Sequence, residues 1–124
     1  MVAGVSPQAN TQPEGLKSEE FALYLLAEDD AVRIADFIWL EEIVEKLEVK
    51  HGVIPEEVEE IFANRPRITR MERGRFQGED VYRALGQTNA GRYLAAFFIH
   101  KRTDDALILS ARDMDRKERK AYAR

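Results

Sequence analysis

Hydrophobic and polar residues follow two different patterns along the chain, and the change falls at Pro66. Between Asp36 and Pro66, apolar residues recur at spacings of three and four, which is the period of one face of an α-helix. After Pro66, apolar and polar residues alternate in the manner of β-strands. The sequence therefore predicts two helices followed by a sheet of consecutive strands.

The segment before Pro66 predicts a short strand at 37–39 and then two helices. The apolar face of the first helix continues to His51, and Gly52 ends the helix. Pro55 suits the first position of the second helix, with Glu56 and Glu57 in the turn where the helix dipole favours acidic side chains. Their buried faces consist of Leu40, Ile43, Val44 and Leu47 in the first helix and of Val58, Ile61 and Phe62 in the second.

The segment after Pro66 predicts an antiparallel meander and a terminal helix. Turn-forming residues separate four candidate strands near 67–73, 80–87, 92–100 and 106–112. Both alternating sets of residues are apolar in Tyr93–Ile99, which favours a central strand covered on both faces. Asp115 and Glu118 have the spacing of a capping box at the start of a basic helix. The expected fold is α+β: an antiparallel sheet of four to five strands, two N-terminal helices packed on it, and a basic C-terminal helix.

Residues 1–35 show no clear period. The first fifteen are rich in Gly, Pro and polar residues, and a possible short helix follows Ser18 before the acidic segment at 28–30. We therefore expect a flexible leader over residues 1–35 and one domain over residues 36–124.

The composition excludes several classes of function. A chain of 124 residues has room for one catalytic domain. It has no cysteine, which rules out disulfides, thiolate zinc sites and cysteine nucleophiles, and its two histidines lie far apart in sequence. The apolar run Phe21–Ala27 is far shorter than the ~20 residues of a membrane span. We expect a cytoplasmic protein without metal, cofactor or membrane partner.

The charge is unevenly divided. Residues 1–63 contain 4 Lys or Arg and 15 Asp or Glu, a net charge of −11, whereas residues 64–124 contain 15 and 8, a net charge of +7. Such asymmetry is typical of a protein whose second half meets a polyanion or an acidic partner. Solvated helix and strand faces would produce the same counts.

The chemically capable side chains are mostly cationic, which favours RNA as the substrate. RNA contains its own nucleophile, the 2′-hydroxyl, so cleavage needs a base, a group that stabilises charge on phosphorus and an acid, but no metal. The candidate catalytic residues are His51, Arg83, Arg112 and Tyr122, and the candidate RNA-binding residues are Lys50, Arg92, Arg116 and Arg119.

Each of these residues also has a structural interpretation. Arg112 ends the last strand, where a guanidinium clamps two phosphate oxygens or forms an ion pair with a carboxylate of the first half. His51 suits proton transfer or a hydrogen-bonded position in the core, and Tyr122 suits base stacking or packing on the sheet. His100 is interpreted as an ordinary residue at a strand edge.

The order and spacing of these residues resemble the BrnT family of type II toxins from about Phe37 to the C-terminus. The shared landmarks are Phe37-x-Trp39, Lys50-His51-Gly52-Val53, Glu56-Glu57, Phe62, Pro66, Tyr82 with Gly86, Gly91-Arg92, Ile108-Leu109-Ser110-Ala111-Arg112, Glu118-Arg119 and Tyr122. Many relatives have an arginine just before the tyrosine that corresponds to Tyr82. This chain has Val81 there and carries Arg83 after the tyrosine, on the same side of the strand.

The resemblance implies a fold similar to the RelE ribonucleases and a toxin that cleaves RNA. It also implies a BrnA-like antitoxin that wraps the toxin, with DNA contacted only indirectly through the antitoxin. The competing hypothesis is a non-catalytic interaction module, in which the basic surface binds an acidic antitoxin or nucleic acid in an autoregulatory complex.

Overall fold

The computed structural model describes residues 23–26, 31–72, 74 and 79–123. Its elements run along the chain as β1 Leu23–Leu26, β2 Ala31–Ile34, β3 Asp36–Ile38, α1 Glu41–His51, α2 Pro55–Ala63, β4 Arg67–Glu72, β5 Val81–Gln87, β6 Tyr93–His100, β7 Asp105–Asp113 and α3 Arg116–Ala123. The fold is α+β, as the sequence predicts. Among the residues described, no helix is long and apolar enough to cross a membrane.

Five strands form the main sheet in the order β3-β7-β6-β5-β4. Strands β4 to β7 pair antiparallel with their sequence neighbours, which confirms the predicted meander and the central place of β6. The short strand β3 adds to the edge of the sheet beside β7 and runs parallel to it. Parallel pairing was not expected, and it follows because α1 and α2 separate β3 from the meander along the chain.

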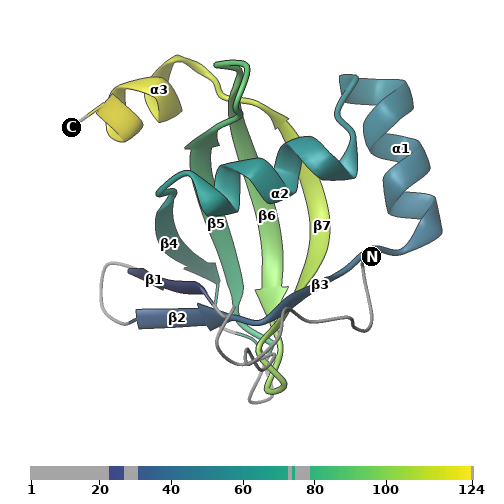
Figure 1. The fold of residues 1–124 in the computed structure, drawn as a ribbon, viewed down its shortest axis with the longest axis vertical. Coiled ribbons are helices and arrows are strands. Elements are labelled where there is room, and N and C mark those ends of the chain that lie inside the picture. Colours follow the sequence, from purple (N-terminus) through teal and green to yellow (C-terminus); the bar gives the residue numbers. More distant parts are fainter. Residues whose placement is uncertain (1–22, 27–30, 73, 75–78, 124) are drawn as a thin grey trace, which may run out of the picture.

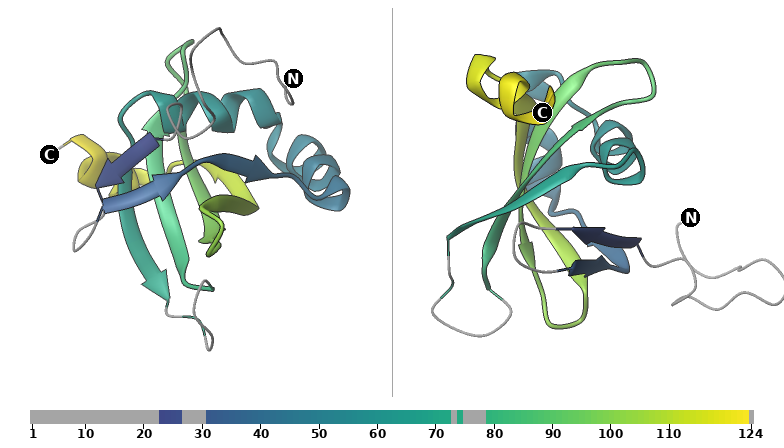
Figure 2. Two further views of the ribbon diagram at one scale, coloured as in Figure 1. Left: turned by 60° about the horizontal axis from the view of Figure 1, so that its bottom comes forward. Right: turned by 90° about the vertical axis from the view of Figure 1, so that its left-hand side faces the viewer.

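Helix α2 lies across one face of the sheet, which we call the helix face, and α1 packs beside β7 (Figures 1 and 2). The core lies between α2 and the sheet. It is built from residues of α2 and from alternate residues of the strands: Val58, Ile61, Phe62, Tyr82, Ala84, Leu94, Ala96, Phe98 and Ile108. Helix α2 lies so close to β5 that a Cβ atom added to Gly86 would lie 2.8 Å from the Cβ atom of Ile61. Gly52 ends α1 at φ 61°, as predicted for a helix-ending glycine.

An irregularity in β7 decides which residues face away from the helices. Phe97 pairs with Ser110 and Phe98 pairs with Ile108, so one extra residue lies in β7 between these pairs. Ile108 and Ala111 are consequently both buried on the helix face, although strict alternation would separate them. The same bulge directs Arg112 to the opposite face, which we call the open face.

The N-terminal segment differs from the prediction. Leu23–Leu26 forms a strand, where a possible short helix was expected, and pairs antiparallel with Ala31–Ile34. A continuous apolar run offers no single helical stripe, and pairing with a second strand satisfies its backbone. Val32 and Ile34 belong to the main core, and Arg33 forms an ion pair of 2.6 Å with Asp104. The part of the predicted leader over residues 1–22 lies outside the described residues.

Candidate functional site

Helix α3 is fixed to the open face by its first turn. The backbone N–H of Asp115 donates to Oε1 of Glu118 at 2.9 Å, and the N–H of Glu118 donates to Oδ1 of Asp115 at 2.8 Å. These reciprocal bonds confirm the predicted capping box. They also place the carboxylate of Glu118 between the helix and the sheet, where the residue is only 5% exposed.

The buried carboxylate of Glu118 holds two of the candidate catalytic arginines. The two Nη atoms of Arg112 donate to Oε1 and Oε2 at 2.7 and 2.9 Å, and Nη1 of Arg83 lies 3.8 Å from Oε2. The hydrogen bond from Arg112 lowers the pKa of Glu118, and the same bond raises the pKa of Arg112. The sequence-based alternative of an ion pair for Arg112 therefore describes what the structure has, but the carboxylate belongs to α3 and not to the first half of the chain.

The geometry of Arg112 leaves part of its guanidinium for another anion. A guanidinium has five N–H groups, and three of those of Arg112 donate to Glu118 and to the carbonyl oxygen of Asp113. The Nε proton and one Nη2 proton are not used in these bonds. The guanidinium of Arg112 lies over the ring of Phe97, with its carbon atom 5.3 Å from the ring centroid. Within the described part of the chain, Nε of Arg83 is buried without a hydrogen-bond partner.

Tyr93 is the centre of a second cluster beneath α3. The guanidinium carbon of Arg119 lies 4.1 Å from the Tyr93 ring centroid, and the Tyr122 ring meets Tyr93 edge-on at 6.1 Å. Tyr122 also packs against the apolar group formed by Leu85, Ala95 and Met114. This position agrees with the packing interpretation of Tyr122 and puts its ring at the junction of α3 and the sheet.

Arg92 has a different environment from the other candidate RNA-binding residues. Its guanidinium donates to the carbonyl oxygens of His51 and Gly52 at 2.9 and 2.8 Å, and to carboxylates of Glu57 and Asp113. It thus ties the end of α1 to the start of α2 and the end of β7. The hydrogen bond from Arg92 lowers the pKa of Asp113, and the charges of Arg92 and His51 act in the same direction.

His51 lies at this joint as the last residue of α1 and is half-buried. Its backbone is held by Arg92, and its side chain is close enough to Asp113 to lower the pKa of that carboxyl. Asp113 is adjacent in sequence to Arg112 and accepts one of its hydrogen bonds. The structure therefore links His51 to the arginine cluster through a single residue.

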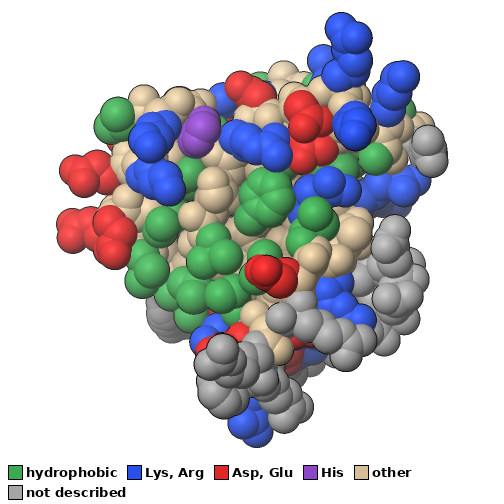
Figure 3. Space-filling view, turned by 180° about the vertical axis from the view of Figure 1, so that it is seen from behind, with side chains coloured by type: hydrophobic (Ala, Val, Ile, Leu, Met, Phe, Trp, Pro, Cys, Tyr) green, Lys and Arg blue, Asp and Glu red, His purple; other side chains and the backbone are tan. Residues whose placement is uncertain are grey.

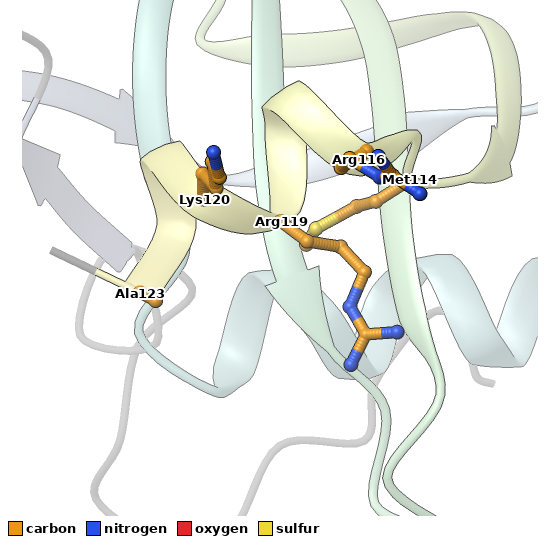
Figure 4. Close-up of a pocket in the computed structure, with 5 residues that line it drawn as sticks. All are labelled: Met114, Arg116, Arg119, Lys120 and Ala123. Atoms are coloured by element: carbon orange, nitrogen blue, oxygen red, sulfur yellow. The ribbon is translucent and has the colours of Figure 1, made fainter.

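The remaining candidate cations lie on the surface. Lys50, Arg116 and Arg119 are exposed. A shallow depression along α3 is lined by Met114, Arg116, Arg119, Lys120 and Ala123 (Figure 4). In this view Arg119 extends from the helix across the sheet, whereas Lys120 points to the other side of the helix. His100, expected to be an ordinary edge residue, lies away from this site and meets the carbonyl oxygen of Arg33 at 2.7 Å.

Three residues of the site were missed by sequence reasoning. Glu118 was identified as a helix cap and as a shared landmark of the family, but nothing local in the sequence shows that its carboxylate pairs with Arg112. Tyr93 and Phe97 were assigned to a buried central strand, and their role as supports for Arg119 and Arg112 depends on where α3 docks. The signal in the sequence that points to contacts between this strand and α3 is the presence of apolar residues on both faces of 93–99, together with a basic helix at the end of the chain.

The comparisons with known proteins identify the family of the chain. None of the curated proteins matches the chain. The family described as "Ribonuclease toxin, BrnT, of type II toxin-antitoxin system" matches residues 39–118, from the residue after β3 to the first turn of α3. This match covers well over half of the 124 residues. The chain belongs to the BrnT family of ribonuclease toxins of type II toxin–antitoxin systems.

Proposed function

We propose that this toxin is a metal-independent endoribonuclease that cleaves RNA by attack of the 2′-hydroxyl on the adjacent phosphodiester. The reaction releases the 5′-oxygen of the next nucleotide and leaves a 2′,3′-cyclic phosphate. The proton of the 2′-hydroxyl goes to a base, and the leaving oxygen takes a proton from an acid. The charge that builds on the phosphate oxygens is stabilised by cationic donors fixed before the substrate arrives.

One observation carries this proposal: a buried carboxylate holds Arg112 and Arg83 together at the junction of the sheet and α3. Arg112 is positively charged, as every arginine is at neutral pH, and the hydrogen bond to Glu118 raises its pKa further. The bidentate bond also fixes the plane of the guanidinium, so its Nε and Nη2 protons have a set direction toward a phosphate. Arg83 adds a second positive charge beside the same phosphate.

The other candidates take roles that follow from their positions. His51 is the proposed proton-transfer group, because an imidazole can both accept and donate a proton near neutral pH. Tyr122 is the second candidate for proton donation. Lys50, Arg116 and Arg119 are exposed and bind the RNA backbone on either side of the cleaved bond. Arg92 is reassigned from RNA binding to positioning, because its donors hold His51, Gly52, Glu57 and Asp113.

The test is cleavage of a labelled RNA in EDTA, with the ends of the products identified. Arg112→Lys keeps a charge for Glu118 but loses the fixed plane, and we expect at least a tenfold loss of cleavage. Arg112→Ala should lose about a hundredfold or more. Arg102→Ala is the matched control, since Arg102 is an exposed arginine in the turn between β6 and β7. Thermal unfolding of each variant shows whether it is folded.

Two results would contradict the proposal. Full cleavage by folded Arg112→Lys and Arg112→Ala would show that Arg112 is not part of the catalytic site. Products without a cyclic phosphate would exclude attack by the 2′-hydroxyl. Salt-sensitive RNA binding without turnover would favour the non-catalytic interaction module instead. As a type II toxin the protein acts with an antitoxin, and we propose that this partner is BrnA-like and that any DNA contact is made through it.

A further inference from the structure

The open face of the sheet carries three rows of side chains that run across the strands. Strand pairing aligns Leu85, Ala95 and Arg112 in the row nearest α3, and Arg83, Phe97 and Ser110 in the next. The third row contains Val81, Ile99 and Leu107, and it continues into β3 because Ile38 pairs with Leu107. We call this third row, Ile38, Leu107, Ile99 and Val81, the aliphatic row.

The aliphatic row is not covered by any described element. Helix α3 packs on the first row through Ala121 and Tyr122, together with Met114 just before the helix. Rows on one face of a strand are roughly 7 Å apart, so the third row lies about two rows beyond the helix contact. All four side chains of the aliphatic row are half-buried, whereas Phe98, Ala106 and Ile108, which lie next to the row on the helix face, are fully buried. Figure 3 shows this face, with a continuous area of hydrophobic side chains in its middle.

The chemistry around the row selects the kind of partner. Lys and Arg side chains gather where α3 borders the hydrophobic area (Figure 3), and Arg83 and Arg112 lie between α3 and the row. At the other end, pairing with Val81 places Glu72 beside the row. Four aliphatic side chains offer neither rings for base stacking nor donors for phosphates, so they do not suit RNA. They suit a protein segment with an apolar stripe that has carboxylates along the side facing α3.

We propose that the aliphatic row is the docking surface for the antitoxin, which binds it through an amphipathic acidic segment. The proposal rests on the toxin function, because a type II toxin has a protein antitoxin. A segment seated on the row lies next to Arg83 and Arg112 and pairs its carboxylates with them and with α3. The antitoxin then competes for the same cations as the RNA phosphate, and inhibition follows from the position of the row.

The test compares lysine substitutions on the row with the same substitution elsewhere. Ile99→Lys lies in the middle of the row and Val81→Lys near its edge, and neither residue belongs to the proposed catalytic machinery. Val49→Lys is the control, since Val49 is 80% exposed on α1. The probe is the product of the neighbouring gene that relieves growth arrest caused by this chain. Its Kd is measured by calorimetry, with thermal unfolding to verify folding.

We expect each row variant to weaken antitoxin binding at least tenfold, because an apolar contact of the row is replaced by a charge. Val49→Lys should stay within about twofold of the wild type. Both row variants should still cut RNA at about the wild-type rate when no antitoxin is present. If Ile99→Lys does not fold, Val81→Lys carries the comparison.

Three outcomes would overturn the proposal. Wild-type affinity in the folded row variants would place the antitoxin elsewhere. A dimeric wild-type chain that Ile99→Lys makes monomeric, with unchanged antitoxin affinity, would make the row an interface between copies. Lost RNA cleavage with unchanged antitoxin affinity would make it an RNA surface. If the wild type cuts no RNA at all, the nuclease proposal fails, while the comparison of Kd values still decides the docking proposal.

Discussion

Replacing Glu118 tests the physical basis of the site, because one carboxylate caps α3 and holds both arginines. Glu118→Ala removes the bidentate bond to Arg112 and the bond from the backbone of Asp115. Hydrogen bonds to charged groups contribute about 1.5–3 kcal/mol, and a lost cap costs about 1 kcal/mol. Arg112 is partly exposed and regains water, so we expect the free energy of unfolding to fall by about 2–4 kcal/mol.

Glu118→Gln separates the two contributions. The amide oxygen still accepts the N–H of Asp115, but the negative charge between Arg83 and Arg112 is lost. We therefore expect a loss of about 1–2 kcal/mol, less than for Glu118→Ala. Urea denaturation at pH 7 measures both values. Equal stability of the wild type and the two variants would show that α3 is held by its apolar contacts alone.

The pH dependence of stability gives a second, independent comparison of the wild type and Glu118→Gln. The pKa of Glu118 is lowered in the folded state, first by the hydrogen bond from Arg112. Such a group stabilises the fold above its unfolded pKa of about 4.3, and this stability is lost as the pH falls through the lower folded pKa. The difference in stability between the wild type and Glu118→Gln should thus be full at pH 7 and shrink below about pH 4. A difference that stays constant down to pH 3 would contradict the ion pair.

Two further substitutions test how the site is positioned. Arg92→Ala removes the donors that join His51 at the end of α1 to Glu57 and Asp113. We expect the free energy of unfolding, measured by urea titration, to fall by about 2–3 kcal/mol. A change below about 0.5 kcal/mol would contradict the positioning role and leave Arg92 free for RNA binding. Gly86→Ala puts a Cβ atom 2.8 Å from the Cβ atom of Ile61. We expect the free energy of unfolding to fall by about 1–3 kcal/mol, which is measured as a lower Tm. An unchanged Tm would mean that α2 moves away from β5 at little cost.

The helices and the meander were predictable because their signals are local. Gly52 ends α1 and Pro55 starts α2, each through its own backbone preference. The structure places both helices at the predicted positions. The four predicted strands agree with β4 to β7 within one or two residues. The hairpin of β1 and β2 was missed because its strands are short and its stability depends on contacts such as that between Arg33 and Asp104.

The site was less predictable because its residues meet through long-range packing. Arg112 reaches the open face only because an extra residue lies in β7, and single-residue alternation cannot reveal such a bulge. Glu118 was visible as a cap, yet its second role depends on α3 folding back over the sheet. The sequence therefore offers the cations as candidates, but it does not show which carboxylates orient them in the fold.

The structure also changes the meaning of the charge asymmetry. A net charge of +7 in residues 64–124 suggests a uniformly attractive surface for RNA, but Arg83, Arg92 and Arg112 each lie beside carboxylates inside the fold. In the proposed mechanism those three arginines set the geometry, while the exposed cations of α3 supply the long-range attraction for RNA. Because orientation and attraction are assigned to different residues, losing an exposed cation should weaken RNA binding and its salt dependence, whereas losing Arg112 should lower the rate of cleavage at saturating RNA.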